Sequence, residues 1–594
     1  MKTFLSFVFL SSLCPLCLCG ETLAAPPDEL LRLAPDDAGF CLVVRDLRGH
    51  LERLAQSPLA ARLAASRFGQ AFRDDPAARK LLALDGLLRA QLNVSWEQLR
   101  DDVLGDAVVL AYTPGPPGRP EQEQGLLLVH ARRPELLAEL CDRINELQQK
   151  SGELDALERR DYRGQVYYRR HKKADGDEFY FLRGPVFGFS DKEASIRAAI
   201  DRDRQSPPAT AEPPALARRL QQLGVEQSLL VWWVNPRAFD AALKRKVEQA
   251  TGAEGAFLRT FARYWSALDG AALYLDVGRE FAGGVAVRVR TAELPAAARR
   301  LFAEASRPSA VLASVPDNAL FLAAGRMPMG PLVEAGGEFL APEARQSVQD
   351  AVERSVGALF GREVLGEIVR RVGPDWGVWV TPPEPGAKGW LPSLTAVLRL
   401  RPGANGEPVE QRVLDALDFV ARLAVLGYNS QRSDSLRLRI VPEEGVEVRV
   451  IEGDHLPPGL QPAFAWKGGY LVLASTPEAV RRFKPPCEAD AVRPADDAEV
   501  PLVRLALAGW AGYLRAYRGP LTASLAEAYK LPPAEANARL DRLLDGLDLF
   551  DAVELTQRTA PGRATLTLRL KALPGEPGAS ATGAVPGEGT KKPH

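Results

Sequence analysis

Short apolar runs alternate with polar turns along most of the chain, and they predict a mixture of strands and amphipathic helices. Phe40–Arg45 is a compact apolar run of the length of a buried strand, and helical spacing follows in 47–72 and 76–91. Further strands are predicted at 103–113, 125–131, 164–170, 228–234, 271–276 and 284–290, and further helices at 134–147, 237–267 and 294–305.

A strand, a tight turn, a second strand and a helix start are predicted in Phe179–Arg197. Ser190 and Glu193 have the Ser-x-x-Glu spacing of a capping box. In this motif the serine side chain accepts a hydrogen bond from a free backbone N–H of the first turn, and the glutamate side chain accepts one from the backbone N–H of the serine. The same pattern recurs without a gap in Phe464–Arg482, where Ser475 and Glu478 occupy the matching positions. A capping role is therefore favoured over a catalytic one for these residues.

Other segments repeat in the same order. Residues 316–326 match 35–45, including the Pro-Asp pair, a phenylalanine and a final arginine, and residues 372–382 match 104–114. The residues shared by the copies are those that form turns, caps and cores. These matches indicate a tandem repeat of two homologous units. For each unit we predict an α+β fold with mostly antiparallel sheet packed on helices.

The predicted organisation has four parts, bounded by composition and by the repeat. The first part is a predicted signal peptide and not a folded domain. The last part is predicted to be disordered, because a Pro/Gly-rich tail cannot bury enough apolar area to order itself. The parts are a signal peptide at 1–25, a first unit at 26–310, a second unit at 311–573 and a disordered tail at 574–594.

The N-terminal stretch has the pattern of a secretory signal. Lys2 precedes an apolar run from about Phe4 to Leu18, and small residues then offer a cleavage site near Ala24-Ala25. The run is too short for a comfortable membrane span, and no later stretch reaches the ~18 apolar residues that a span needs. We therefore expect an exported protein, periplasmic or extracellular, without an integral membrane segment.

Charge is balanced, with 75 Lys and Arg against 76 Asp and Glu, and this argues against a nucleic-acid partner. Arg169–Lys173 is a local basic run, which we interpret as an exposed edge strand or a turn with solvated charges. Beyond the predicted signal, Cys41, Cys141 and Cys487 are too few and too far apart for a disulfide framework or a zinc site. At most one pair could be bridged, and free thiols are favoured.

The sequence contains no recognisable catalytic motif, and we assign no catalytic, cofactor-binding or metal-binding residue. His50, His130, His171, His455 and His594 show no metal-ligand spacing. Adjacent acids occur at 36–37, 74–75, 101–102 and 496–497, but neighbouring carboxylates diverge on a strand and favour turns and helix starts. The enzyme question stays open, with the balance against catalysis.

Tryptophans are the other candidates for function. Trp376, Trp379 and Trp390 flank a Pro/Gly loop, and Trp232-Trp233 are neighbours on a predicted strand, so one of that pair should be exposed or at an interface. Exposed tryptophan beside a Pro-rich loop could bind glycan or peptide, although packing is the favoured use.

With the signal, the Pro-Asp strand entry and the doubled module in view, the chain resembles uncharacterised secreted bacterial proteins that carry a duplicated domain of unknown function. The resemblance implies no activity. The leading interpretation is a non-catalytic binding or scaffolding protein of the cell envelope, whose partner is an envelope protein, a glycan or an apolar ligand. The alternatives are a carrier of an apolar ligand and an exported hydrolase that uses carboxylates.

Overall fold

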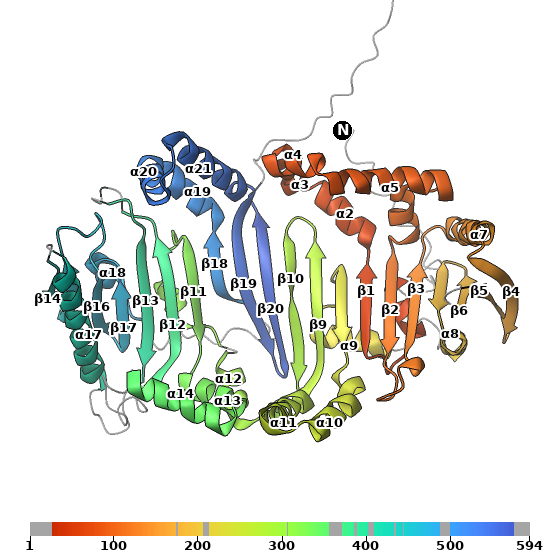
Figure 1. Ribbon diagram of the computed structural model, residues 1–594, viewed down its shortest axis with the longest axis horizontal. Coiled ribbons are helices and arrows are strands. Elements are labelled where there is room, and N and C mark those ends of the chain that lie inside the picture. Colours follow the sequence, from red (N-terminus) through yellow and green to blue (C-terminus); the bar gives the residue numbers. More distant parts are fainter. Residues whose placement is uncertain are drawn as a thin grey trace, which may run out of the picture. The chain divides into compact units, whose positions relative to one another are not determined.

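The computed structural model describes residues 26–173, 176–205, 213–305, 307–355, 371–384, 386, 389–401, 409–432, 435–443, 445–486 and 499–574 (Figure 1). The chain divides into two compact units. Within the described residues, the first unit comprises 26–50, 80–275 and 285–294, and the second comprises 51–79, 276–284 and 295–574. Two segments that precede residue 310, namely 51–79 and 276–284, thus group with the second unit.

Antiparallel strands form the centre of the first unit. In the described residues the strands pair in the order β4-β5-β6-β7-β3-β2-β1-β8-β9-β10, and every pair from β4 to β9 is antiparallel. Their bounds are β1 Phe40–Arg45, β2 Ala107–Thr113, β3 Gln124–His130, β4 Leu154–Tyr162, β5 Gln165–Lys172, β6 Gly176–Arg183, β7 Val186–Ser190, β8 Leu230–Val234, β9 Leu268–Val277 and β10 Phe281–Val289.

Helices bury one face of this sheet. The main core joins the sheet to α1 (Pro26–Leu33), α8 (Glu193–Gln205) and α9 (Ala215–Leu223), with Trp233 and Tyr167 among its largest buried side chains. A smaller core under α7 (Pro134–Ser151) covers the β6–β7 end of the opposite face. The remaining helices between β1 and β10 are α5 Pro76–Leu92, α6 Trp96–Gln98, η1 Leu99–Val103, η2 Pro120–Gln122, η3 Pro236–Phe239, α10 Asp240–Gln249 and α11 Gly252–Ala267, with α2 Leu47–Ala55 directly after β1.

The second unit has its own antiparallel sheet, in the order β14-β15-β16-β17-β13-β12-β11-β18-β19-β20 among the described residues. The strand order is the same in the two units: each strand of the second unit takes the place of the first-unit strand whose number is ten lower. The bounds are β11 Phe321–Arg326, β12 Val372–Thr381, β13 Ser393–Leu400, β14 Arg437–Glu443, β15 Val446–Glu452, β16 Ala463–Lys467, β17 Tyr470–Ala474, β18 Glu499–Ala506, β19 Phe550–Ala560 and β20 Arg563–Ala572.

Three cores hold the second unit together. One packs α18 (Pro477–Arg482) and Phe483 on β13 and β15–β17, a second lies under α17 (Val409–Gln431), and a third lies under α19 (Leu507–Ala516) and α21 (Pro533–Leu547). Two helices from early in the chain, α3 (Pro58–Ala65) and α4 (Arg67–Asp74), also contact this unit. The guanidinium of Arg62 donates to the Leu573 carbonyl at 2.9 Å. The other helices are α12 Ala296–Ala305, α13 Met329–Glu338, α14 Pro342–Ser355 and α20 Arg518–Tyr529, with the 3-10 turns η4 Thr291–Glu293 and η5 Ala310–Ser314.

The predicted mixture of helix and antiparallel sheet is confirmed, and β1 has the predicted bounds. Two details were wrong. The strand expected from residue 103 begins at Ala107, because residues 99–103 form a π-helical turn that follows a capping box between Ser95 and Gln98. Strand β4 was missed, because its sequence LDALERRDY is mostly polar, as is common for a strand at a sheet edge.

The predicted capping boxes are also wrong. Helix α8 begins at Glu193. Ser190 does accept a backbone amide, that of Lys192 at 3.1 Å, and it donates to the Gly125 carbonyl on β3 at 2.6 Å, but the Glu193 carboxylate accepts from Tyr167, Arg160 and Arg197. In the second unit the cap of α18 is Thr476, whose side chain accepts from the Ala479 amide at 3.2 Å. Ser475 accepts from the Leu394 amide on β13 at 2.9 Å. Both serines therefore tie one strand end to the neighbouring strand. The predicted signal at 1–25 and residues 575–594 of the predicted tail lie outside the described residues.

Candidate binding pocket

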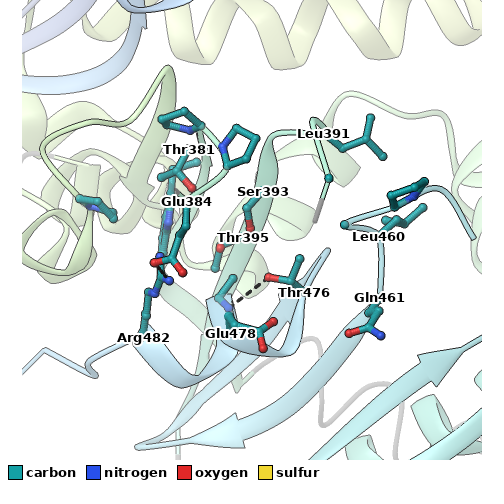
Figure 2. Close-up of a pocket in the computed structure, with 18 of the residues that line it drawn as sticks. Thr381, Glu384, Leu391, Ser393, Thr395, Leu460, Gln461, Thr476, Glu478 and Arg482 are labelled. Atoms are coloured by element: carbon teal, nitrogen blue, oxygen red, sulfur yellow. Dashed lines mark hydrogen bonds and ion pairs between the residues drawn. The ribbon is translucent and has the colours of Figure 1, made fainter. Parts of the chain in front are cut away.

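A cavity of about 720 Å³ opens in the second unit (Figure 2). Four segments far apart in the sequence line it: the region before β11, the end of β12 with the start of β13, the link 453–461 between β15 and β16, and α18 with Phe483. Its lining residues are Ser314, Pro316, Asn318, Trp379, Thr381, Pro382, Pro383, Glu384, Gly389, Leu391, Ser393, Thr395, Gly453, Leu456, Pro457, Pro458, Gly459, Leu460, Gln461, Thr476, Glu478, Ala479, Arg482 and Phe483.

The buried end of the pocket combines aromatic rings with a hydroxyl. Trp379 and Phe483 are buried, and their ring centroids lie 6.2 Å apart. Thr395 is also buried and shares this face of the sheet with Ser393, because side chains alternate along β13. Figure 2 shows Thr381, Ser393, Thr395 and Thr476 around the same space. Thr381, Ser393 and Thr395 lie on β12 and β13, and Thr476 caps α18, so these hydroxyls come from regular elements.

The mouth depends on proline and glycine. Pro382 and Pro383 follow β12 and cannot donate a ladder hydrogen bond, which is consistent with the strand ending at Thr381. Gly389 lies so close to the link 453–461 that a Cβ there would come within 2.0 Å of the Pro458 carbonyl oxygen. Gly459 has φ 89°, a backbone conformation that glycine adopts at little cost. These glycines allow the two loops to approach each other.

The charged groups of the lining pair locally. Arg482 forms an ion pair with Glu384 (Figure 2). Glu478 forms one with Arg481 on the same helix. The other polar side chains of the lining are hydroxyls and amides. Paired charges offer little net attraction to an ion, so this lining suits a neutral ligand that exchanges hydrogen bonds.

The described lining contains no histidine, cysteine or lysine, and no cluster of metal ligands occurs elsewhere in the described residues. Nucleophilic catalysis by a serine or threonine hydroxyl requires an adjacent base. The described lining offers such hydroxyls but no histidine or lysine beside them. Its carboxylates, Glu384 and Glu478, each pair with an arginine. The arrangement can bind and orient a ligand.

The basic run Arg169–Lys173 is neutralised by acids on its neighbouring strands. Arg169 pairs with Glu158 and with Asp177, and Arg170 and Lys172 both pair with Glu178. His171 and Lys173 pair with Asp177 and Asp155. The run occupies β5, between β4 and β6, and not the sheet edge that was expected.

The adjacent acids of the described residues lie on separate elements. Asp101 pairs with Arg100, whose hydrogen bond lowers the pKa of that carboxyl, and Asp102 pairs with Arg133. Asp36-Asp37 lie in the turn after α1, and Asp74-Asp75 lie at the end of α4. Asp496-Asp497 lie outside the described residues, as do His594 and Cys487.

His130 has acidic neighbours that the sequence did not predict. Its Nδ1 lies 3.3 Å from Asp106 and its Nε2 lies 3.6 Å from Glu29, while Glu29 also pairs with Arg183 at 2.7 Å. Arg183 in turn pairs with Asp203 at 2.6 Å. These side chains join α1, β3, β6 and α8 of the first unit, and Arg183 pairs with two carboxylates, as in a structural network.

The neighbouring tryptophans of β8 differ in burial, as expected when successive side chains of a strand point to opposite faces. Trp233 is buried in the core of the first unit and Trp232 is exposed, so the expectation that one of the pair would be exposed is confirmed. Trp379 lines the pocket, and the Trp390 carbonyl accepts from the Tyr513 hydroxyl at 2.8 Å. Cys41 and Cys141 are free thiols, and burial raises the pKa of Cys41 to about 12 and that of Cys141 to about 11. Neither is a reactive thiolate at neutral pH.

Sequence reasoning did not find the pocket, although one signal was present. The offset between matching positions is 268 around residues 372–401 and 285 in Phe464–Arg482. The predicted repeat therefore has more residues between these points in the second unit than in the first, and the link 453–461 lies in that interval. The corresponding link between β5 and β6 spans only residues 173–175.

No protein-family model, curated protein or solved structure matches the chain. The function must therefore be argued from the residues themselves. In the part of the chain that the structure describes, no helix is both long and apolar enough to cross a membrane.

Proposed function

We propose that this chain is an exported, non-catalytic binding protein of the cell envelope, whose pocket in the second unit takes a neutral, hydroxyl-rich ligand such as a short glycan. One observation carries the proposal: the pocket is lined by hydroxyls, amides and apolar rings, while its charged side chains pair locally. Export rests on the signal-like N-terminal pattern alone.

We also propose that the two units arose by duplication of one ancestral unit. The ordered sequence matches support this, and so does the strand order, which recurs with every strand number raised by ten. In this scheme the link 453–461 is an addition to the second unit. The pocket would then be a later specialisation of one copy, and the shared residues would serve the fold.

The test is titration of the full-length protein with a panel of neutral oligosaccharides by isothermal calorimetry, with acidic oligosaccharides in parallel. Thr381→Val removes one hydroxyl from the lining and keeps the side-chain shape. We expect a two- to tenfold loss of affinity, the effect of about one hydrogen bond. The matched control is Thr113→Val, at the equivalent end of β2 in the first unit and outside the pocket lining.

A second variant tests the mouth of the pocket. Gly389→Ala forces the loop away from Pro458, so binding should fall further than in Thr381→Val. Gly336→Ala is its control, because a Cβ at Gly336 in α13 meets nothing within 4 Å. The proposal fails if no neutral saccharide binds, or if the Thr113→Val control weakens binding as much as Thr381→Val. Turnover of a bound saccharide would instead support the hydrolase alternative.

A further inference from the structure

One face of the sheet in the first unit is apolar and open to solvent. Helices α1, α8 and α9 bury the face that carries Trp233, and α7 covers only the β6–β7 end of the other. The uncovered part exposes large side chains to a degree that is unusual for a sheet. The exposed fractions are 38% for Leu110, 44% for Trp232, 46% for Leu273 and 40% for Leu275.

The exposed residues lie on β2, β8 and β9, in rows that continue across β1 and β3, where Val129 at one end is buried. Direct cross-strand partners on one face have neighbouring Cβ atoms, so the rows form one surface. Charged side chains are missing from all three rows. The first row is Leu127, Leu110, Leu42, Trp232 and Leu273; the second is Val129, Val108, Val44, Leu230 and Leu275; the third is Gly125, Tyr112, Phe40, Val234 and Ala271.

Aromatic side chains lie on the three central strands of this surface, β2, β1 and β8. Phe40 stacks on Tyr112 with ring centroids 4.6 Å apart, and it meets Trp232 edge-on at 6.4 Å. Tryptophan and tyrosine are the residues that most often dominate the energy of protein interfaces. They bring large contact area at a low cost in side-chain entropy, so this cluster is a suitable anchor for a protein partner.

The size of the surface matches a small protein interface. Strands lie about 4.8 Å apart and side chains on one face recur about every 6.8 Å, so three rows across five strands cover roughly 500 Å². Two such surfaces in contact bury roughly 1,000 Å² in total, which is the lower limit for a specific association. An apolar surface of this size is also at the upper end of what monomeric proteins expose.

We propose that the first unit self-associates through this surface, with two copies packed sheet against sheet about a twofold axis. A twofold contact places each residue near its own counterpart, so a charged surface would repel itself, whereas these rows carry no charge. Two apolar sheet faces pack stably about 10 Å apart. The small area predicts a reversible dimer that dissociates at micromolar concentration.

The test is sedimentation velocity of the full-length protein over a hundredfold range of concentration. The wild-type protein should change from monomer to dimer through the micromolar range. Trp232→Glu combined with Leu273→Glu places charges at the centre of the surface, and the variant should stay monomeric over the whole range. Leu426→Glu on α17 is the matched control, because Leu426 is 66% exposed and lies in the second unit; it should dimerise like the wild type.

Circular dichroism of each variant confirms folding, which should be unchanged because the substituted side chains are exposed. A wild-type protein that stays monomeric throughout overturns the proposal. A dimer that survives the double substitution places the interface elsewhere and also overturns it. Native mass spectrometry supplies the remaining outcome: a monomer that retains a lipid, lost in the double variant, would make this surface the site of an apolar ligand instead. None of these results bears on the pocket of the second unit.

Discussion

The strands that begin the two units, β1 and β11, both end in an arginine, but the two arginines lie in different surroundings. Arg326 is in register with Asp375 and pairs with it at 3.1 Å and with Glu304 at 3.0 Å. Arg45 is in register with Ala107, and its nearest acid is Asp28 at 4.0 Å. The same backbone position therefore carries a buried ion pair in one unit and an incompletely satisfied cation in the other.

Asp375 explains the difference. Its side chain is 0% exposed, and it accepts hydrogen bonds from the Ser309 hydroxyl at 2.9 Å and the Ala310 amide at 3.1 Å. In the first unit, the Nε and Nη2 atoms of Arg45 are buried without a hydrogen-bond partner among the described residues, whereas Arg326 lacks such a partner only at Nε. Burial lowers the pKa of Arg45, and Asp28 opposes that shift. At this position the second unit buries a hydrogen-bonded carboxylate beside its arginine, whereas the first unit has Ala107.

The largest effect should come from Asp375→Ala. It leaves Arg326 and the Ser309 hydroxyl without their shared partner in the interior, and removing one member of a buried pair costs about 3 kcal/mol. Urea unfolding of the full-length protein, followed by tryptophan fluorescence, measures the change. Glu535→Ala is the contrast, because Glu535 and Arg539 form an exposed i,i+4 pair and the loss should be below about 1 kcal/mol. Equal losses would mean that burial does not determine the contribution of Asp375.

Matched arginine substitutions sharpen the comparison. Arg326→Met should cost about 2 kcal/mol, because Asp375 keeps its bonds to Ser309 and Ala310 but loses its closest cation. Arg45→Met should be within about 0.5 kcal/mol of the wild type, because replacing a poorly paired buried cation by an apolar chain is often neutral. The same urea unfolding experiment measures both. A loss for Arg45→Met as large as that for Arg326→Met would contradict the difference between the two surroundings.

The matching glutamates Glu193 and Glu478 also differ in their surroundings, because one carboxylate is hydrogen-bonded by several groups and the other is exposed. Glu193 accepts from the Tyr167 hydroxyl at 2.5 Å, from Arg197 at 2.8 Å and from Arg160 at 3.0 Å. Burial alone would raise the pKa of this carboxyl, but the hydrogen bonds from Tyr167 and Arg160 and the nearby arginine charges outweigh it and lower the pKa. Glu478 pairs with Arg481 on an exposed helix face.

Glu193→Gln should therefore cost about 1 kcal/mol at pH 7, and Glu478→Gln should have no measurable effect. Because the pKa of Glu193 is lower in the folded state, its carboxylate stabilises the protein above the ordinary pKa of 4.5. This contribution is lost as the pH falls through the lowered value. Thermal unfolding from pH 7 to pH 3 should show the wild type and Glu193→Gln converging in acid. A constant difference across that range would contradict the prediction.

The sequence predicted the apolar strands and the mixed fold well, because a buried strand such as β1 is visible in its own residues. It missed β4, whose alternating charges pair across strands that the sequence alone does not place side by side. The arginines at 45 and 326 were recognised as a repeated pair, but Asp375 was not recognised as the partner of Arg326. The pocket was missed because its lining comes from four distant segments, and only the shift of the repeat offset marked the inserted link.

The place of β1 in its sheet has a consequence for the order in which the chain folds. It is the first strand to be synthesised, but it lies between β2 and β8, and Phe40 pairs with Val234 on one side and with Tyr112 on the other. The edge of β1 that faces β8 therefore stays unpaired until about residue 234 is available. Contacts of such long sequence separation slow folding and leave unpaired strand edges open to wrong partners. Because β11 lies in the same way between β12 and β18, each unit must be almost completely synthesised before its central strand is paired on both sides.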